Sequence, residues 1–268
     1  MPTPSHAPTV DTHVHAGLTK YEPVESLIDQ MGHHGVDHAV LVQHMGMFDN
    51  DYLIDCARRH PGRFAIACLV NPEDPHATAT LEAIVGTHPA VQGIRLYLAD
   101  LFAGIPGAIA LWEKANDLGL NITMAGTLAH LASDEMVATV RRFTKARLHV
   151  EHLSHPNPRE DAPYPTYQRA LTLSAFDNTV LKVSGFYSFT TSPWSPYFDT
   201  LRFVDMALKA YGPERMMWGS DFPPVSGREG YGNAITFGRT HIPIADSHLR
   251  SALMGGTAMK YWKFDTTA

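Results

Sequence analysis

Two histidines near the start of the chain have the type and spacing of metal ligands. His13 and His15 lie in the segment Thr-Val-Asp-Thr-His-Val-His, residues 9–15, which reads as a short β-strand. Successive side chains of a strand point to opposite faces, so we expect Asp11, His13 and His15 to share one face. Two neighbouring imidazoles can bind one metal ion, but in a chain with 16 histidines such a pair also arises by chance. The motif therefore indicates a metal site only if its surroundings supply further ligands.

Short apolar segments alternate with helix-like stretches along the whole chain. In residues 136–143 and 201–211, apolar side chains recur at helical spacing. We expect eight strands, at residues 9–15, 38–44, 64–71, 91–98, 120–125, 148–153, 179–185 and 216–221. Strands that alternate with helices through short links predict a parallel sheet, and eight units predict its closure into a distorted (β/α)₈ barrel of the TIM type. A doubly wound open sheet is the alternative.

The length of the chain suits one domain of this kind. A (β/α)₈ barrel typically has about 250 residues, and this chain has 268. No linker, charge run or internal repeat marks a second domain. We therefore expect a single α/β barrel over residues 9–265, behind a flexible N-terminus at residues 1–8 that is rich in Pro and small polar residues.

Composition and motifs argue against several classes of function. The net charge is −6 without a basic cluster, which disfavours nucleic acid or an anionic membrane as a partner. No apolar run reaches membrane-spanning length and no signal peptide is visible, so we expect no membrane association. The two cysteines form no CxxC pair, which fits a reducing cytoplasm. Nucleophile-elbow, Walker A and dinucleotide-binding motifs are absent.

In such a barrel the active site lies at the C-terminal ends of the strands, so polar residues there can be read together. Arg95 and Tyr97 alternate with Ile94, Leu96 and Leu98, which predicts that the aliphatic side chains face the helices and that the two polar ones point inward. A buried arginine needs an anion, either a protein carboxylate or a substrate. The polar residues at the predicted strand ends are His13, His15, His44, Arg95, Tyr97, Glu151, His152, His155, Lys182, Ser184 and Asp221.

Several of these residues also have a purely structural interpretation. His44 and His155 are candidates for substrate contacts, but both can be hydrogen-bonded loop histidines. Arg95 and Lys182 can pair with carboxylates inside the barrel. Asp221 can be a turn residue, because two prolines follow it closely.

The loop after the seventh predicted strand is rich in aromatic residues. Residues 187–198 hold five of them, including Tyr187 and Trp194, among Ser, Thr and Pro. The segment is either a surface loop packed by its own aromatics or a pocket wall for a ring or an apolar group. On the second interpretation we expect Tyr187 and Trp194 to contact the substrate.

Four stretches carry a family resemblance. They are Asp-Thr-His-Val-His at 11–15, Gly-Ile-Arg-Leu at 93–96, Glu-His at 151–152 and Trp-Gly-Ser-Asp-Phe-Pro at 218–223. Together they resemble the amidohydrolase superfamily, and within it the amidohydrolase-2 branch, which holds lactonases and non-oxidative decarboxylases. The likeness spans nearly the whole chain in the right order. It implies the same barrel fold.

The resemblance also implies roles for individual residues. His13 and His15 would help to bind a divalent metal, and Asp221 would carry a proton and serve as a ligand. His152 would polarise a carbonyl group or transfer a proton. Arg95 would contact a carboxylate or a carbonyl oxygen of the substrate.

The fifth predicted strand departs from the family pattern. Many relatives place a histidine ligand at its end, whereas here Met124 stands near that position, and a thioether is a poor ligand for a borderline ion. The ligands would then be the two strand-one histidines and Asp221, with His152 or His130 as a further candidate. Zinc is the first choice of metal, and it can be weakly held or absent, as in some lactonases of the branch. Residues 93–98 contain no lysine, which argues against a carbamate-bridged pair of metals.

We therefore expect a hydrolase that opens a lactone or a similar cyclic ester of a small organic or sugar acid. Asp221 would accept a proton from water and pass it to the departing alkoxide. Arg95 and Lys182 are the only cations placed inward on the strands, so we expect a mono-anionic or neutral small molecule as substrate. The alternatives are a decarboxylase or hydratase of the same branch, a sugar-lactone isomerase, and an inactive metabolite-binding barrel. No sequence feature forces a homo-oligomer, which stays open.

Overall fold

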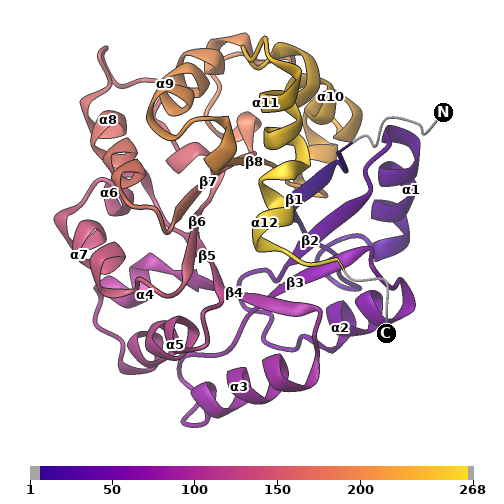
Figure 1. Cartoon of the computed structure of the whole chain (residues 1–268), viewed down its shortest axis with the longest axis vertical. Coiled ribbons are helices and arrows are strands. Elements are labelled where there is room, and N and C mark those ends of the chain that lie inside the picture. Colours follow the sequence, from indigo (N-terminus) through magenta and orange to yellow (C-terminus); the bar gives the residue numbers. More distant parts are fainter. Residues whose placement is uncertain (1–6, 265–268) are drawn as a thin grey trace.

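The computed structural model describes residues 7–264 and shows a ring of parallel strands surrounded by helices (Figure 1). Each strand pairs with the next one along the chain, from β1 to β8. The predicted (β/α)₈ barrel is therefore confirmed. The strands are β1 (Val10–Val14), β2 (His38–Val42), β3 (Phe64–Cys68), β4 (Val91–Tyr97), β5 (Asn121–Ala125), β6 (Arg147–Val150), β7 (Thr179–Val183) and β8 (Met216–Trp218).

The first and last strands close the ring just beyond the end of β8. The Asp221 N–H donates to the His13 carbonyl at 2.9 Å, and the His15 N–H donates to the Phe222 carbonyl at 2.7 Å. Val14 and Phe222 form an isolated parallel bridge. The closure therefore joins His13 and His15 to the Asp221 turn through the backbone.

Helices cover the outside of the barrel (Figure 1). In α9, for example, Phe203, Val204 and Ala207 are buried, and Gly212 follows the last turn with a positive φ of 70°. The longer helices are α1 (Val24–His34), α2 (Asp51–Arg59), α3 (Ala77–Thr87), α5 (Pro106–Asp117), α7 (Asp134–Arg142), α8 (Pro165–Leu171), α9 (Leu201–Tyr211) and α10 (Tyr231–Thr236). The shorter ones are α4 (Leu98–Phe102), α6 (Leu128–Leu131), α11 (Ser247–Ser251) and α12 (Ala258–Tyr261).

The barrel interior is apolar at the end where the strands begin. Val10, Val180 and Met217 form a small inner core there with Trp262 and Phe264 of the C-terminal segment. A Cβ on Gly93 would lie 2.8 Å from the Trp262 ring, so glycine is required for this close packing. The inner core closes this end of the barrel and leaves the other end to the polar residues.

All eight strands are shorter than expected, and the early ends of β6 and β8 bear directly on the site. β6 ends at Val150 and β8 at Trp218, instead of 153 and 221. The residues that follow leave the extended conformation, because His152–His155 and Asp221 have φ values between 47° and 64°. This left-handed region is rarely adopted by residues other than glycine.

Two sequence expectations fall partly outside the described residues. Most of the predicted flexible N-terminus, residues 1–6, lies there, as does the predicted domain boundary at 265. Within residues 7–264, no helix combines the length and the apolar character needed to cross a membrane.

Candidate active site

A cluster of buried polar side chains lies inside the barrel at the C-terminal ends of the strands. This is where the strand positions predict that chemistry collects. The cluster consists of His13, His15, Glu151, His152, Lys182 and Asp221, with the partly buried Arg95.

Asp221 lies close to His13 on β1 and to His15, which directly follows β1. Its Oδ1 atom lies 3.7 Å from His13 Nε2 and 3.6 Å from His15 Nε2. The His13 and His15 rings are perpendicular, with centroids 5.0 Å apart. His15 Nδ1 makes a 2.7 Å hydrogen bond with the Val42 carbonyl, which fixes that ring. The Asp221 carboxylate thus lies against both imidazole rings, as the predicted side-by-side arrangement of the first and eighth strands requires.

Asp11 does not share the face of the two histidines, and this corrects the sequence expectation. The pairing of β1 with β2 shifts register between Asp11 and Val14, so the alternation of side chains is interrupted. The Asp11 carboxylate accepts the backbone N–H groups of Ser220 at 2.8 Å and His13 at 3.3 Å. Burial raises the pKa of Asp11 to about 6. Asp11 therefore ties the backbones of β1 and the Asp221 turn together and does not orient the imidazole rings.

The second oxygen of Asp221 is held by Tyr187. The Tyr187 hydroxyl donates to Asp221 Oδ2 at 2.6 Å. Burial would raise the pKa of Asp221, but the His152 and His15 rings, together with this hydroxyl, hold it well below its usual range. Asp221 is thus an ionised carboxylate with one oxygen occupied and the other facing the two imidazoles.

Arg95 points inward as predicted, but a protein carboxylate already pairs with it. Arg95 Nη2 donates to Glu151 Oε2 at 2.9 Å. Burial opposes the charge of Glu151, yet the Arg95 guanidinium outweighs it and lowers the pKa of Glu151 to about 2. Of the two anions expected for Arg95, the structure therefore supplies the protein carboxylate, and a substrate would meet a neutralised pair.

His152 lies against His13 and is fixed by a serine. The centroids of the two rings are 4.6 Å apart, and His152 Nδ1 lies 2.9 Å from Ser184 Oγ. Burial lowers the pKa of His152, so the ring is neutral at neutral pH. His155 follows at a centroid distance of 4.9 Å from His152. The left-handed turn at the end of β6 brings both rings into the site.

Lys182 lies below the histidines and is fully buried. Its Nζ atom is 3.3 Å from His13 Nδ1 and 3.3 Å from Thr123 Oγ1. Burial lowers the pKa of Lys182 to about 7. Because Lys182 is fully buried and already contacts His13 and Thr123, its expected contact with the substrate stays a prediction.

The family model described as Amidohydrolase matches residues 10–264. The chain belongs to the amidohydrolase family. This confirms the family resemblance read from the four motifs. The protein is therefore an amidohydrolase-type enzyme.

Individual relatives agree with this assignment. The L-fucono-1,5-lactonase of Burkholderia ambifaria is 27% identical over 249 residues, which cover 86% of this chain and 81% of that protein. A structure described as a 2-pyrone-4,6-dicarboxylic acid hydrolase, from Pseudomonas putida, matches with a TM-score of 0.81 at 24% identity and covers 97% of this chain and 99% of that one. A Burkholderia multivorans amidohydrolase with bound zinc has a TM-score of 0.80 at 20% identity and covers 95% and 99%. At these identities the two structures show a shared fold.

The residues of this amidohydrolase fit a divalent metal. The ligand atoms of His13, His152 and Asp221 all lie within 4.8 Å of one another. Within the described chain, the buried His13 Nε2 atom has no hydrogen-bond partner. Imidazole nitrogens and a carboxylate oxygen are common zinc ligands. Met124 packs in the outer core, and neighbouring Thr123 points inward, so β5 supplies no further strong ligand.

The remaining predicted residues of the amidohydrolase site lie around the central cluster and make fewer contacts with it. His44 is buried beside Tyr21, with ring centroids 4.9 Å apart. Burial lowers the pKa of His44 to about 4. Tyr97 lies beside Arg95, with the guanidinium carbon 5.6 Å from its ring centroid. Trp194 is 79% exposed, so its substrate contact stays a prediction.

Sequence reasoning missed two residues of the site. Tyr21 stacks on His15 at a centroid distance of 5.1 Å, although it lies in the loop after β1. Thr123 supports Lys182 from the neighbouring part of the barrel. The inward position of Thr123 follows from strand alternation on β5, which was a usable signal. Tyr21 lies in a loop and carries no such signal.

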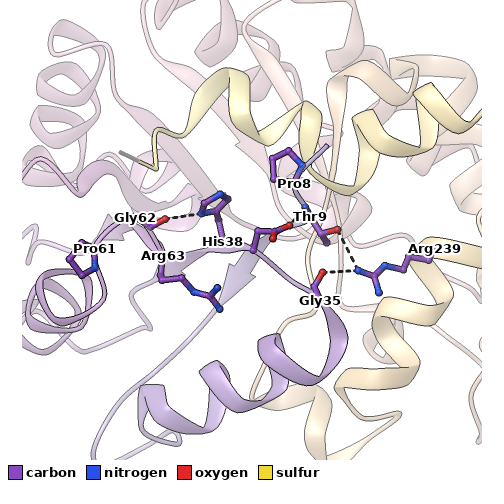
Figure 2. A pocket seen from close by; sticks show the side chains of 9 residues that line it. Pro8, Thr9, Gly35, His38, Pro61, Gly62, Arg63 and Arg239 are labelled. Carbon is purple, nitrogen blue, oxygen red and sulfur yellow. Dashed lines mark hydrogen bonds between the residues drawn. The ribbon is translucent and has the colours of Figure 1, made fainter. Parts of the chain in front are cut away.

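Two surface hollows lie at the other end of the barrel. One, of about 660 Å³, is shown in Figure 2 and lies beside the start of β1, β2 and β3. Its polar groups hold the chain together: Asp37 accepts the Thr9 N–H at 2.8 Å, and Arg239 donates to the Gly35 carbonyl at 2.9 Å. The second, of about 940 Å³, borders the start of β3, β4 and β5. Neither contains the buried histidine cluster, so we place the candidate active site at the opposite end.

Proposed function

We propose that this amidohydrolase opens a lactone, or a similar cyclic ester, of a small organic or sugar acid by adding water to the carbonyl carbon. The observation that carries the proposal is the Asp221 carboxylate, which Tyr187 holds on one side while its free oxygen faces His13 and His15. The L-fucono-1,5-lactonase relative supports a lactone as the substrate class.

Asp221 acts as the proton carrier in this proposal. The ionised carboxylate removes one proton from water as the water oxygen bonds to the carbonyl carbon. The ring C–O bond then breaks, and the proton on Asp221 passes to the departing alkoxide. The product is an open-chain hydroxy acid, and Asp221 returns to its carboxylate form.

His152 stabilises the negative charge that develops on the carbonyl oxygen. If the Ser184 hydroxyl donates to Nδ1, the proton of the neutral ring stands on Nε2. An N–H group aimed at a developing oxyanion is an effective catalytic arrangement in a site that excludes water. His152 therefore contributes a donor without changing its own charge.

His13, His15 and Asp221 would hold a divalent metal, with zinc as the proposed ion. When bound there, the ion would polarise the carbonyl group and lower the pKa of a bound water molecule. The zinc-bound relative from Burkholderia multivorans supports this choice of metal.

The charges of the site favour a mono-anionic or neutral substrate. Arg95 is already paired with Glu151, and Lys182 is fully buried. Arg228 lies nearer the rim, with its guanidinium carbon 5.9 Å from the Tyr187 ring centroid, and can meet one carboxylate. A substrate with two carboxylates would require more unpaired guanidinium groups. We propose that Tyr97, His44, His155, Tyr187 and Trp194 line its binding site.

We also propose a cytoplasmic location. Cys56 and Cys68 are both free and buried, which fits a reducing compartment.

A hydrolysis screen with an Asp221 variant tests the proposed function. Wild type should open at least one compound in a panel of aldonolactones and muconolactones, and Asp221→Asn should lower kcat by about 10²–10⁴-fold. A variant that keeps full turnover would contradict the role of Asp221. Loss of carbon dioxide from the substrate would identify a decarboxylase, and an isomeric product would identify a lactone isomerase.

A further inference from the structure

Lys182 is a fully buried lysine that the proposed reaction does not use. Its Nζ atom contacts His13 Nδ1 and Thr123 Oγ1, both at 3.3 Å. Lysine is rarely buried this completely unless it has a partner. Its position therefore calls for a function that acts through His13.

The contact with Lys182 determines where the proton of His13 stands. The Lys182 Nζ atom faces the Nδ1 edge of the His13 ring, and both side chains are fully buried. A neutral imidazole has one donor and one acceptor nitrogen, and an ammonium group only donates. With Lys182 donating to Nδ1, the proton of His13 stands on Nε2.

A metal ion requires the opposite arrangement. The Nε2 atom, which faces Asp221 at 3.7 Å, can bind a metal only through its lone pair. The proton must then stand on Nδ1 and find an acceptor there. Glu151 Oε1 lies 3.9 Å from His13 Nδ1 and has no hydrogen-bond partner in the part of the chain that the structure describes.

We propose that Lys182 and Glu151 compete for His13 Nδ1 and so set how tightly this amidohydrolase holds a divalent metal. Lys182 favours the tautomer that cannot bind the metal through Nε2. Glu151 favours the tautomer that can. Both residues are positioning residues, since they act through His13. The inference rests on the proposed metal ligands and does not depend on the identity of the lactone.

The tautomer of His13 is measured directly by ¹⁵N NMR of histidine-labelled, metal-free enzyme, with the signals assigned through His13→Gln. Wild type should show a protonated Nε2 and an unprotonated Nδ1. Lys182→Met should move the proton to Nδ1. Thr123→Val is the matched control, because it removes the other partner of Lys182 and should leave the wild-type tautomer unchanged. If the wild-type spectrum alone shows the proton on Nδ1 in the metal-free enzyme, the proposal is overturned.

Zinc affinity, measured by competition with a chromophoric chelator at one near-neutral pH, provides the second readout. Lys182→Met should bind zinc about 10–100-fold more tightly than wild type, and Glu151→Gln should bind it more weakly by a similar factor. Thermal unfolding shows whether each variant is folded, and Glu151→Gln tests the same competition if Lys182→Met does not fold. Affinities unchanged by either substitution overturn the inference. Failure to open any lactone while these shifts appear would overturn the proposed function alone.

Discussion

At the scale of single residues, one phenol determines how Asp221 behaves as a base. The Tyr187 hydroxyl donates to Asp221 Oδ2 at 2.6 Å and stabilises the ionised form. A hydrogen bond to a charged group is worth about 1.5–3 kcal/mol. The same contact also orients the carboxylate, so that its other oxygen faces His13 and His15.

Tyr187→Phe should therefore shift the pH dependence of the reaction. Removing the donor destabilises the carboxylate, so the pKa of Asp221 rises, and the acidic limb of the kcat/KM profile should move upward by about one pH unit or more. We expect kcat at neutral pH to fall about 10-fold as the carboxylate loses its orientation. An acidic limb at the wild-type position would show that Tyr187 does not act on the proton carrier.

The Glu151–Arg95 pair has a consequence for stability in acid. The pKa of Glu151 is lowered from 4.5 to about 2 in the folded protein, against the effect of burial, by the charge of Arg95. Because this pKa is lower in the folded protein, the ionised Glu151 adds to the free energy of unfolding. That contribution is complete above pH 4.5 and is lost as the pH falls towards 2. Breaking a buried ion pair from one side costs about 3–5 kcal/mol.

Glu151→Gln should accordingly be less stable than wild type by about 3–5 kcal/mol at pH ~5, and the difference should narrow by pH ~3. Urea unfolding of both proteins at the two pH values measures this. If the difference in unfolding free energy between wild type and Glu151→Gln is the same at both pH values, the ion pair does not titrate as described.

At the scale of the elements, the site depends on the close approach of β1 and the segment after β8. A Cβ on Gly219 would lie 2.9 Å from His13 Cβ and 3.0 Å from His13 N. Only glycine allows this contact without movement of the backbone. The Asp11 carboxylate fastens the same two segments through the Ser220 N–H.

Gly219→Ala should push the two segments apart and displace His13. We expect a loss of about 1–3 kcal/mol of stability, typical of overpacking, and a lower kcat. Gly227→Ala is the control, because a Cβ there meets nothing within 4 Å. Unchanged activity in Gly219→Ala would show that the approach of the two segments is not needed for catalysis.

The sequence predicts where the strands lie in the chain better than the residues at which they end. Apolar runs placed all eight strands, because burial on both faces selects continuous apolar segments. The register shift after Asp11 and the left-handed turn at His152 were not predicted, and a turn at Asp221 was only one of two interpretations. They arise from tertiary contacts at the mouth of the barrel, and the local pattern of residue types does not contain them.

At the scale of the whole molecule, the two ends of the barrel differ in composition and in their proposed role. Trp262 and Phe264 close one end with an apolar core, and the buried histidines and carboxylates occupy the other. The sequence predicted which residues gather at the polar end, because strand ends meet in a closed barrel. It did not predict that Arg95 is neutralised by Glu151 or that Lys182 lies beneath His13, since both depend on contacts between distant strands.

The most direct test of the central claim, addition of water to a lactone carbonyl at this end of the barrel, is hydrolysis in ¹⁸O-labelled water followed by mass spectrometry of the product. We predict that the product gains one water molecule and carries one ¹⁸O atom in its new carboxylate, and that Asp221→Asn forms it far more slowly. A product with the label in the hydroxyl group, or one that has gained no water, would contradict the account.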